Sequence, residues 1–378
     1  MIRIAVIHDW LTGMRGGEYV LEAITELFNP SDLFTLVYVT GSVSPELTRR
    51  KINISWLQKF PKAEKRYRHF LPLMPSAIES FDLSSFDLII SSSHCVAKGI
   101  RKPKSAVHVS YVHAPMRYIW DRYEDYFGPG KSSLAVRVAA RLVRKNLQMW
   151  DKKASGPDRV DQLIANSHFI ADQIKQAYGR DSKVIHPFAN LGRFKNQSRH
   201  PGANYLMVGA FAPYKRTDLA IEAFNRLKLP LQIVGSGQEE DRLKKLAGPT
   251  IQFLGHVSNE AITELYSKCR AFIFPGIEDF GITPLEAMAA GAPVIALNQG
   301  GGAETVTSET GIFFKTQSVE ALMEAVQTME INYTNFSAAA CRKRASEFSK
   351  ARFQSELLAT VRRAWASAGK DPKLLAGF

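Results

Sequence analysis

The sequence has no apolar run of about 18 residues, only three cysteines, and no acidic excess. A membrane-spanning helix needs roughly 20 predominantly apolar residues, so none is expected. The cysteines Cys95, Cys269 and Cys341 are odd in number and form no CxxC pair, which argues against a disulfide framework or a zinc site. The N-terminus lacks the long apolar region and the small-residue cleavage site of a signal peptide, and we therefore expect a cytoplasmic protein.

The chain is strongly basic, with a formal net charge of +13 over 378 residues. The excess lies mainly in the first half, because residues 1–185 hold 27 Lys and Arg against 18 Asp and Glu, whereas the remainder holds 22 against 18. Such a balance suits an anionic partner, either a membrane surface, a phosphorylated lipid or a nucleic acid, and a generally basic solvated surface is the alternative. No nucleic-acid-binding module is visible in the sequence, so we expect no nucleic-acid partner.

Strand-like apolar runs alternate with helical patterns along the chain, which is typical of parallel sheets covered by helices on both faces. The expected strands of the first half are Ile2–Ile7, Phe34–Val39, Phe86–Ser91, Ala106–Val112, Leu163–Ala165 and Lys183–His186. Those of the second half are Tyr205–Val208, Leu231–Val234, Ile251–Leu254, Ala271–Phe274, Pro293–Ala296 and Gly311–Phe313. The sequence therefore predicts an α/β protein with two doubly wound, Rossmann-like domains.

The domain boundary is expected in the Pro-, Gly- and Asn-containing stretch Pro187–Ala203, which precedes a fresh strand. The predicted ranges are a first domain at 1–187, a second domain at 188–350, and a C-terminal helical segment at 351–378 that returns to the first domain. Ligands of such sheets bind beyond the carboxyl ends of the strands. We therefore expect the site residues in the loops that follow the strands.

The loop after the first strand carries Gly16 and Gly17 at the start of a helix. Their backbone N–H groups can approach an anion at the helix N-terminus, although glycines in a tight strand-to-helix turn have a purely structural explanation too. After the first strand of the second domain, Lys215 and Arg216 form a plausible diphosphate clamp at another helix start. Cations are disfavoured at that end of a helix, so an anion should offset them.

Two carboxylates follow the strand Ala271–Phe274. Glu278 lies in a Gly- and Pro-containing loop, and Glu286 is expected in the first turn of a helix that begins at Pro284. Carboxylates suit vicinal sugar hydroxyls, because they accept two charge-assisted hydrogen bonds. A helix N-terminal carboxylate paired with the helix dipole is the structural alternative for Glu286.

The spacing Glu278-x7-Glu286, within EDFGITPLEAMAAGAPVIA, resembles the signature of retaining glycosyltransferases of family 4. The resemblance covers nearly the whole chain through the ordered segments DWLTGMRGGEYVLEAI, YVHAPMRYIWDRYEDYF, IANSHFIADQI, VIHPFANLGRF, VGAFAPYKRTDLAIEAFN, IVGSGQEEDRLKKLA, FLGHVSNEAITELYSKC and GGGAETV. It implies the GT-B fold, in which two Rossmann-like domains face each other across a cleft. Within the family, the chain is most similar in style to the O-antigen and lipopolysaccharide mannosyltransferases.

The resemblance also implies roles for individual residues. The catalytic ones are His113, which contacts the transferred sugar, Lys215, which neutralises the departing diphosphate, and Glu278, which holds sugar hydroxyls near the reacting carbon. Residues that bind the donor would lie beside the diphosphate, the ribose hydroxyls or the base: Gly16, Gly17, Arg216, His256, Val257, Asp279, Phe280, Gly281, Ile282, Thr283, Glu286 and Glu304.

The implied reaction is the retaining transfer of a hexose from a nucleotide-sugar to a lipid-linked or surface-polysaccharide acceptor. GDP-mannose is the expected donor, with a UDP-sugar second. No Asp-x-Asp occurs in the sequence, so we expect no metal site and no cofactor apart from the donor. Cations and helix dipoles would stabilise the charge of the leaving group in place of a metal ion.

The chain departs from the family pattern at Ala210, where an arginine usually stands five residues before Lys215, and at Phe188 and Asn190, where a proline and an aspartate are usual. The loss of that arginine keeps open a catalytically weak nucleotide-sugar-binding protein. A nucleotide-sugar 2-epimerase, which shares the architecture and needs no acceptor, is the other alternative.

A basic amphipathic helix is expected over Ser132–Ser155, with Arg137, Arg141, Arg144 and Lys145 on one side and Leu134, Val138, Leu142 and Trp150 elsewhere. Together with the basic residues Lys59, Lys62, Lys65, Arg66 and Arg68, it would dock the first domain on anionic lipid. The protein is then expected to be peripheral on the inner face of the membrane. Ordinary packing with a solvated basic face is the alternative.

Overall fold

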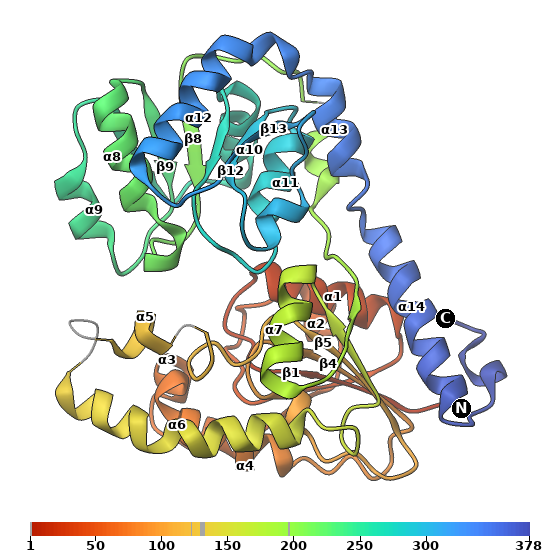
Figure 1. The fold of residues 1–378 in the computed structure, drawn as a ribbon. Helices are drawn as coiled ribbons and strands as arrows, with labels where there is room; N and C mark the ends of the chain where they lie inside the picture. The colour runs from red at the N-terminus through yellow and green to blue at the C-terminus, as the bar shows by residue number, and fades with distance from the viewer. Residues whose placement is uncertain (1, 122, 129–132, 196) are drawn as a thin grey trace. The chain divides into compact units, whose positions relative to one another are not determined.

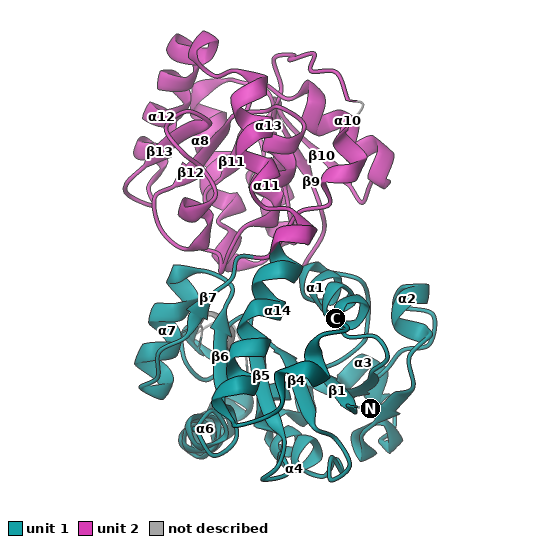
Figure 2. Ribbon diagram, turned by 90° about the vertical axis from the view of Figure 1, so that its right-hand side faces the viewer, with its two compact units in different colours: residues 1–186, 353–378 teal, residues 187–352 magenta. Residues whose placement is uncertain are grey.

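A computed structural model describes residues 2–121, 123–128, 133–195 and 197–378 of the chain (Figure 1). The chain forms two compact units, shown in different colours in Figure 2. Unit 1 contains Met1–His186 together with Phe353–Phe378, and unit 2 contains Pro187–Arg352. Each unit is a parallel α/β structure, as the alternation of strand and helix patterns predicts.

Unit 1 holds a seven-stranded parallel sheet in the order β3-β2-β1-β4-β5-β6-β7. Its strands are β1 (Ile4–His8), β2 (Asp32–Thr35), β3 (Ile52–Ile54), β4 (Leu88–Ser93), β5 (Val107–Val112), β6 (Gln162–Ala165) and β7 (Lys183–Val184). Its helices are α1 (Gly16–Leu27), α2 (Pro45–Thr48), α3 (Ala63–Arg66), α4 (Met74–Glu79), α5 (Tyr123–Phe127), α6 (Leu134–Ala154) and α7 (His168–Tyr178). The strand order reverses between β1 and β4, so the loops after these two strands meet at the carboxyl edge of the sheet.

The C-terminal helix α14 (Lys350–Ser367) belongs to unit 1 from Phe353 onward (Figure 2). Its apolar stripe includes Phe353, Leu357, Val361 and Trp365, which are all buried. The ring of Phe353 lies 5.5 Å from that of Tyr111 on β5. This stripe therefore joins the last part of the chain to the sheet that the first part forms.

Unit 2 holds a six-stranded parallel sheet in the order β10-β9-β8-β11-β12-β13. Its strands are β8 (Tyr205–Val208), β9 (Leu231–Val234), β10 (Ile251–Gly255), β11 (Phe272–Phe274), β12 (Val294–Leu297) and β13 (Gly311–Phe314). Its helices are α8 (Thr217–Leu227), α9 (Glu240–Leu246), α10 (Asn259–Lys268), α11 (Ile282–Ala289), α12 (Val319–Asn332) and α13 (Ala338–Ser346). The strand order reverses between β8 and β11, which defines the switch point of this sheet.

Both faces of the unit 2 sheet are buried, as β11 illustrates. Phe272 and Phe274 belong to one apolar cluster and Ile273 to another, because successive side chains of a strand point to opposite faces. Such strands read as continuous apolar runs, which is why the sequence pattern locates them well.

Three local expectations were wrong. The strand expected at Phe34–Val39 ends at Thr35, although Leu36 and Val37 remain buried. The short edge strand β3 has no strong apolar pattern and was not expected. Helix α11 begins at Ile282, two residues before Pro284, because Gly281 adopts φ +94° and caps the helix there. Glu286 therefore lies beyond the first turn.

The described residues were also examined for membrane-spanning helices and for the state of the cysteines. Among their helices, none is long and apolar enough to cross a bilayer. Cys95, Cys269 and Cys341 are free and buried.

Candidate functional site

Three histidines gather at the switch point of unit 1, where β1, β4 and β5 end. His8 is the last residue of β1, His94 follows β4, and His113 follows β5. The rings of His8 and His94 lie 5.4 Å apart, and those of His94 and His113 lie 6.1 Å apart. Ser92 connects the outer two, since its Oγ lies 2.9 Å from Nε2 of His113 and 3.2 Å from Nδ1 of His8.

This edge also contains one carboxylate and one glycine from the start of α1. Glu18 is buried, and its Oε1 lies 3.9 Å from Nε2 of His8. A Cβ atom added to Gly17 would lie 3.8 Å from the ring of His113 and 3.9 Å from that of His8. Gly16 and Gly17 are the first two residues of α1, so their N–H groups belong to the unsatisfied end of the helix. The structure thus brings Gly16, Gly17 and His113 to the same edge, together with His8 and Glu18.

Burial favours the neutral form of His94 and of His113 at this edge. Burial lowers the pKa of His94 to about 3, and the positive form of His8 would add to the effect. Burial likewise lowers the pKa of His113 well below its usual range, with His94 and His8 contributing. Burial opposes the ionisation of Glu18, but the hydrogen bond and charge of His8 outweigh it, so that the pKa of Glu18 is lowered. Neutral histidines beside a carboxylate suit polar, uncharged ligand groups such as sugar hydroxyls.

The neighbouring Asp9 has a structural role. Its carboxylate accepts backbone N–H groups from four consecutive residues, His94, Cys95, Val96 and Ala97, at 2.6–3.0 Å. The carboxylate therefore fixes the loop after β4 and, with it, the position of His94.

In unit 2, Lys215 and Glu278 come together at the switch point. Lys215 ends the short 3-10 helix Pro213–Lys215 after β8, and Glu278 lies in the loop after β11. Nζ of Lys215 donates a hydrogen bond to Oε2 of Glu278 at 2.5 Å, and their side chains are only 14% and 16% exposed. An anion was expected beside Lys215, and in the structure this anion is the carboxylate of Glu278.

Glycines allow the loops around this ion pair to pack closely. A Cβ on Gly276 would lie 2.7 Å from the carbonyl oxygen of Tyr214 and 2.9 Å from Cα of Lys215. A Cβ on Gly301 would lie 2.0 Å from the carbonyl oxygen of Asp279. The main chain of Tyr214 and Lys215 therefore occupies the space that a side chain at position 276 would need.

Glu286 is held from two sides within unit 2. Its Oε2 accepts a hydrogen bond from the hydroxyl of Tyr266 at 3.1 Å, and its Oε1 lies 2.9 Å from Nη2 of Arg193. Burial raises the pKa of Glu286, while Arg193 and Tyr266 act in the opposite direction. Tyr266 and Arg193 were given no role from the sequence, although both lie within segments that resemble the family.

Arg216 is directed to a different set of partners from Lys215. Its Nε donates to Asp218 at 3.1 Å, and its Nη1 donates to Gln317, also at 3.1 Å. Gln317 in turn donates to the carbonyl oxygen of Pro275 at 2.9 Å, in the loop that carries Glu278. The guanidinium of Arg216 therefore holds this loop through Gln317.

The other predicted donor-binding residues lie in loops and helix starts at the carboxyl edge of the unit 2 sheet. Their burial differs, because Phe280 and Gly281 are buried whereas His256 is exposed. Partly buried residues of this set are Val257, Asp279, Ile282, Thr283 and Glu304. The structure thus brings Lys215 and Glu278 into contact, whereas Glu286 contacts Tyr266 and Arg193.

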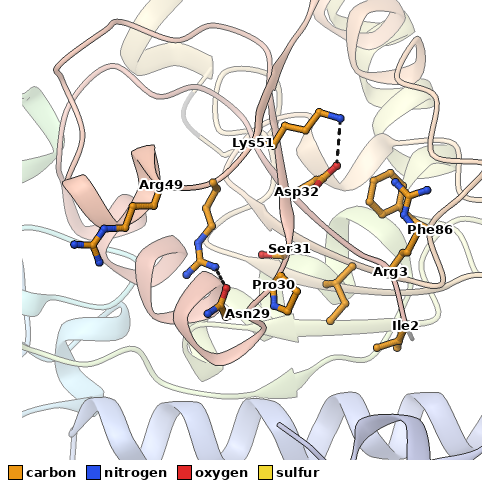
Figure 3. Close-up of a pocket in the computed structure, with 11 residues that line it drawn as sticks. Ile2, Arg3, Asn29, Pro30, Ser31, Asp32, Arg49, Lys51 and Phe86 are labelled. Carbon is orange, nitrogen blue, oxygen red and sulfur yellow. Dashed lines mark hydrogen bonds and ion pairs between the residues drawn. The ribbon is translucent and has the colours of Figure 1, made fainter.

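A separate hollow of about 380 Å³ lies at the opposite edge of the unit 1 sheet (Figure 3). It is lined by residues at the amino ends of the strands, including Arg3, Asp32 and Lys51. Nζ of Lys51 lies 3.8 Å from Oδ2 of Asp32. None of the residues predicted to bind the donor lines this hollow.

The fold of the chain is the GT-B fold of glycosyltransferases. The apo form of the lipopolysaccharide outer core galactosyltransferase WaaB is similar with a TM-score of 0.67, over 94% of this chain and 98% of that protein, at 16% identity. Sucrose-phosphate synthase from Thermosynechococcus elongatus gives a TM-score of 0.72 over 97% and 100% of the two chains, at 19% identity. At such identities the likeness concerns the fold alone.

The sequence of unit 2 is similar to one family of glycosyltransferases. Residues 190–348 match the family model described as "Glycosyl transferases group 1". The matching region contains Lys215, Glu278 and Glu286.

Curated relatives match the chain over part of its length. The O-antigen chain mannosyltransferase C of Escherichia coli is 28% identical over 189 residues, which cover 45% of this chain and 51% of the relative. Glycogen synthase of Mycobacterium tuberculosis is 29% identical over 187 residues, which cover 45% of both chains. The chain thus spans about half the length of the curated relatives that it matches. These two relatives match about equally well and carry different names, so neither name identifies a sugar for this chain.

Proposed function

We propose that the protein is a retaining glycosyltransferase that transfers a hexose from a nucleotide-sugar to a lipid-linked or surface-polysaccharide acceptor. The observation that carries this proposal is the Lys215–Glu278 ion pair at the switch point of unit 2, inside the region that matches the family. In open α/β sheets, ligands bind at this edge. Unit 2 would bind the donor, and unit 1 would contribute the acceptor side.

We propose GDP-mannose as the donor, with a UDP-sugar second. A relative in Corynebacterium glutamicum named as a GDP-mannose-dependent mannosyltransferase is 36% identical over 105 residues, covering 25% of this chain and 28% of the relative. Support for the second choice is weaker. A structure of an Anabaena protein in complex with UDP has a TM-score of 0.68 to this chain, over 95% of this chain and 99% of that one, at 15% identity.

Donor binding begins with an exchange of partners at Lys215. In the structure its ammonium group is neutralised by Glu278. A nucleoside diphosphate offers several anionic oxygens to the same group, so we propose that it replaces the carboxylate. Glu278 is then free to accept hydrogen bonds from the hydroxyls of the sugar.

In the transfer step, the bond between the anomeric carbon and the β-phosphate oxygen breaks, and negative charge develops on that phosphate. Lys215 stabilises this charge. The acceptor hydroxyl oxygen bonds to the anomeric carbon from the same face, and its proton passes to the departing phosphate oxygen. The configuration is thereby retained, and no nucleophile of the protein is required. His113 contacts the transferred sugar, and no step is assigned to a metal ion.

The donor site is tested first by thermal shift with GDP, UDP, ADP and their sugar conjugates, with and without magnesium. A ligand present at about 100 times its dissociation constant stabilises the folded protein by about 2.7 kcal/mol. We expect a shift with GDP that magnesium leaves unchanged and that the variant Lys215→Met loses. The exposed Lys245 of α9 provides the matched control, Lys245→Met, which should retain the shift.

The same protein, incubated with donor alone and then with donor plus a lipid-linked acceptor, distinguishes the alternatives. A glycosylated acceptor supports the transferase. Conversion of the donor sugar without acceptor would establish the 2-epimerase instead. Donor binding without either reaction would support the weak nucleotide-sugar-binding protein that Ala210 keeps open. The absence of any nucleotide shift in folded protein would contradict all three.

A further inference from the structure

Helix α6 of unit 1, labelled in Figure 1, carries several large apolar side chains that are exposed to solvent. Leu134 is 72% exposed and Leu142 is 73% exposed, and Val138 and Met149 are also more than half exposed. Single exposed apolar residues are common on protein surfaces, but several on one helix form a patch that needs an explanation.

The opposite side of α6 fixes the helix to unit 1. Leu147 and Ala154 are buried there. Asp151, fully buried between them, forms an ion pair with Lys98 at 2.7 Å and accepts a hydrogen bond from Trp120 at 2.8 Å. The helix is therefore anchored through its C-terminal half, and the outward direction of the remaining face is defined by these contacts.

The exposed apolar residues and the basic residues of α6 share one face. Leu134, Val138, Leu142 and Met149 recur at intervals of four or seven residues, which keeps them within one side of a helix. Arg141, Lys145, Lys152 and Lys153 lie among them, and all four are exposed. The expectation that basic and apolar residues occupy different sides was thus wrong.

Arg144 was expected on the basic side of the helix, but its side chain contacts other residues of unit 1. Its Nε donates to the carbonyl oxygen of Ile119 at 3.0 Å, and its guanidinium lies 4.0 Å from the ring centre of Tyr123. Ser132, which was expected in the helix, lies outside the described residues, and α6 begins at Leu134.

The charges of this face indicate what kind of surface it fits. Asp151 is the only acidic residue in the sequence of α6, and it is buried against Lys98. The exposed face thus offers only positive charge, which suits an anionic partner. A nucleic acid would be held by the basic residues alone and would leave Leu134 and Leu142 in water. The combination of leucines with interleaved Lys and Arg is what an interfacial helix presents to a bilayer.

We propose that the outer face of α6, defined by Leu134, Val138, Arg141, Leu142, Lys145, Met149, Lys152 and Lys153, docks unit 1 on an anionic lipid bilayer. The apolar side chains enter the boundary between headgroups and acyl chains, and the basic side chains contact lipid phosphates. This proposal is independent of the transfer reaction, because no residue of the face belongs to the candidate site.

The test is flotation of the full chain with vesicles of phosphatidylcholine alone and of phosphatidylcholine with phosphatidylglycerol. We expect the protein to float only with the anionic vesicles and to be released at high ionic strength. Leu142→Glu should weaken binding at least tenfold, because it replaces a leucine side chain that would enter the lipid by a charged one. Lys145→Glu should weaken it about fivefold or more, since each basic residue near such a surface contributes about that factor.

Helix α9 of unit 2 provides matched control variants, because Leu246 and Lys245 are exposed there in the same way. Leu246→Glu and Lys245→Glu should bind the anionic vesicles as the unchanged protein does. All four variants alter exposed side chains, and equal thermal melting points will show that they fold alike.

Three results would overturn the proposal. The first is equal binding to neutral vesicles. The second is an anionic-vesicle affinity that Leu142→Glu leaves unchanged. The third is competition in which double-stranded RNA displaces the protein from vesicles and Leu142→Glu binds that RNA normally, which would mark the face as a nucleic-acid surface.

Discussion

Replacing Glu278 with glutamine should move nucleotide binding and sugar transfer in opposite directions. In the structure, Glu278 neutralises Lys215 across 2.5 Å, and both side chains are largely shielded from water. A diphosphate has to separate this pair before it can use the lysine. Glutamine keeps the shape of the side chain but removes its charge, so the ammonium group of Lys215 becomes more available to the ligand.

The magnitude follows from the strength of such contacts. Hydrogen bonds to charged groups contribute about 1.5–3 kcal/mol each. The diphosphate recovers much of this when it replaces the carboxylate, so we expect E278Q to bind GDP about tenfold more tightly, a gain of about 1.4 kcal/mol. The transfer rate should nevertheless fall by about 100-fold or more, because glutamine accepts hydrogen bonds from the sugar hydroxyls more weakly and carries no negative charge.

Titration calorimetry with GDP and UDP, combined with transfer assays, measures both effects on the same protein. Lys215→Met is the reference, since it should weaken binding and transfer together. Weaker GDP binding by E278Q would refute the exchange of partners, because the carboxylate would then support the diphosphate rather than compete with it. Unchanged transfer would show that Glu278 does not hold the sugar.

Further predictions concern stability, space and charge. His94 has a pKa of about 3 in the folded protein, below its ordinary value of 6.5, so its contribution to stability is complete above pH 6.5 and is lost as the pH falls toward 3. His94→Gln should therefore reduce the slope of unfolding free energy between pH 4 and 6 by about 1.4 kcal/mol per pH unit in urea titrations, and an unchanged slope would contradict the shift. Gly17→Ala should retain its melting temperature but lose transfer activity, whereas Gly301→Ala should lose about 1–3 kcal/mol of stability from the clash. Ala210→Arg adds a cation at an exposed position near Lys215 and should strengthen GDP binding up to about tenfold, with the exposed Ala339→Arg as the neutral control.

The fold was predictable because its strands are buried on both faces. The pattern gives β8 and β9 with their observed bounds, since Tyr205–Val208 and Leu231–Val234 are short apolar runs next to turn residues. The edge strand Ile52–Ile54 escapes such a search, because it is only three residues long and none of them is fully buried. The start of α11 was missed for a different reason. A glycine with φ +94° ends the preceding loop, and the sequence does not reveal which glycine of a loop takes that conformation.

The candidate site was predictable only where a motif carries it. Lys215 and Glu278 stand out because each follows a strand in a Gly- and Pro-containing segment. The histidine cluster of unit 1 is harder to foresee, since His8, His94 and His113 come from three strands far apart in the sequence. Their meeting depends on the order β1-β4-β5 in the sheet, which a strand pattern alone does not fix. Arg193 likewise reaches Glu286 through the tertiary fold.

The ion pair of Lys215 and Glu278 is better explained as part of a binding site than as a contribution to stability. A largely buried ion pair contributes little to the free energy of unfolding, because the desolvation of both charges offsets their attraction. To form it, the chain brings main-chain segments so close that Gly276 and Gly301 have no room for a Cβ atom. Charges held ready at the switch point of a sheet are what an anionic ligand requires. Ala210 is exposed, so a single cation added at this position would change the affinity for the diphosphate without disturbing the packed loops.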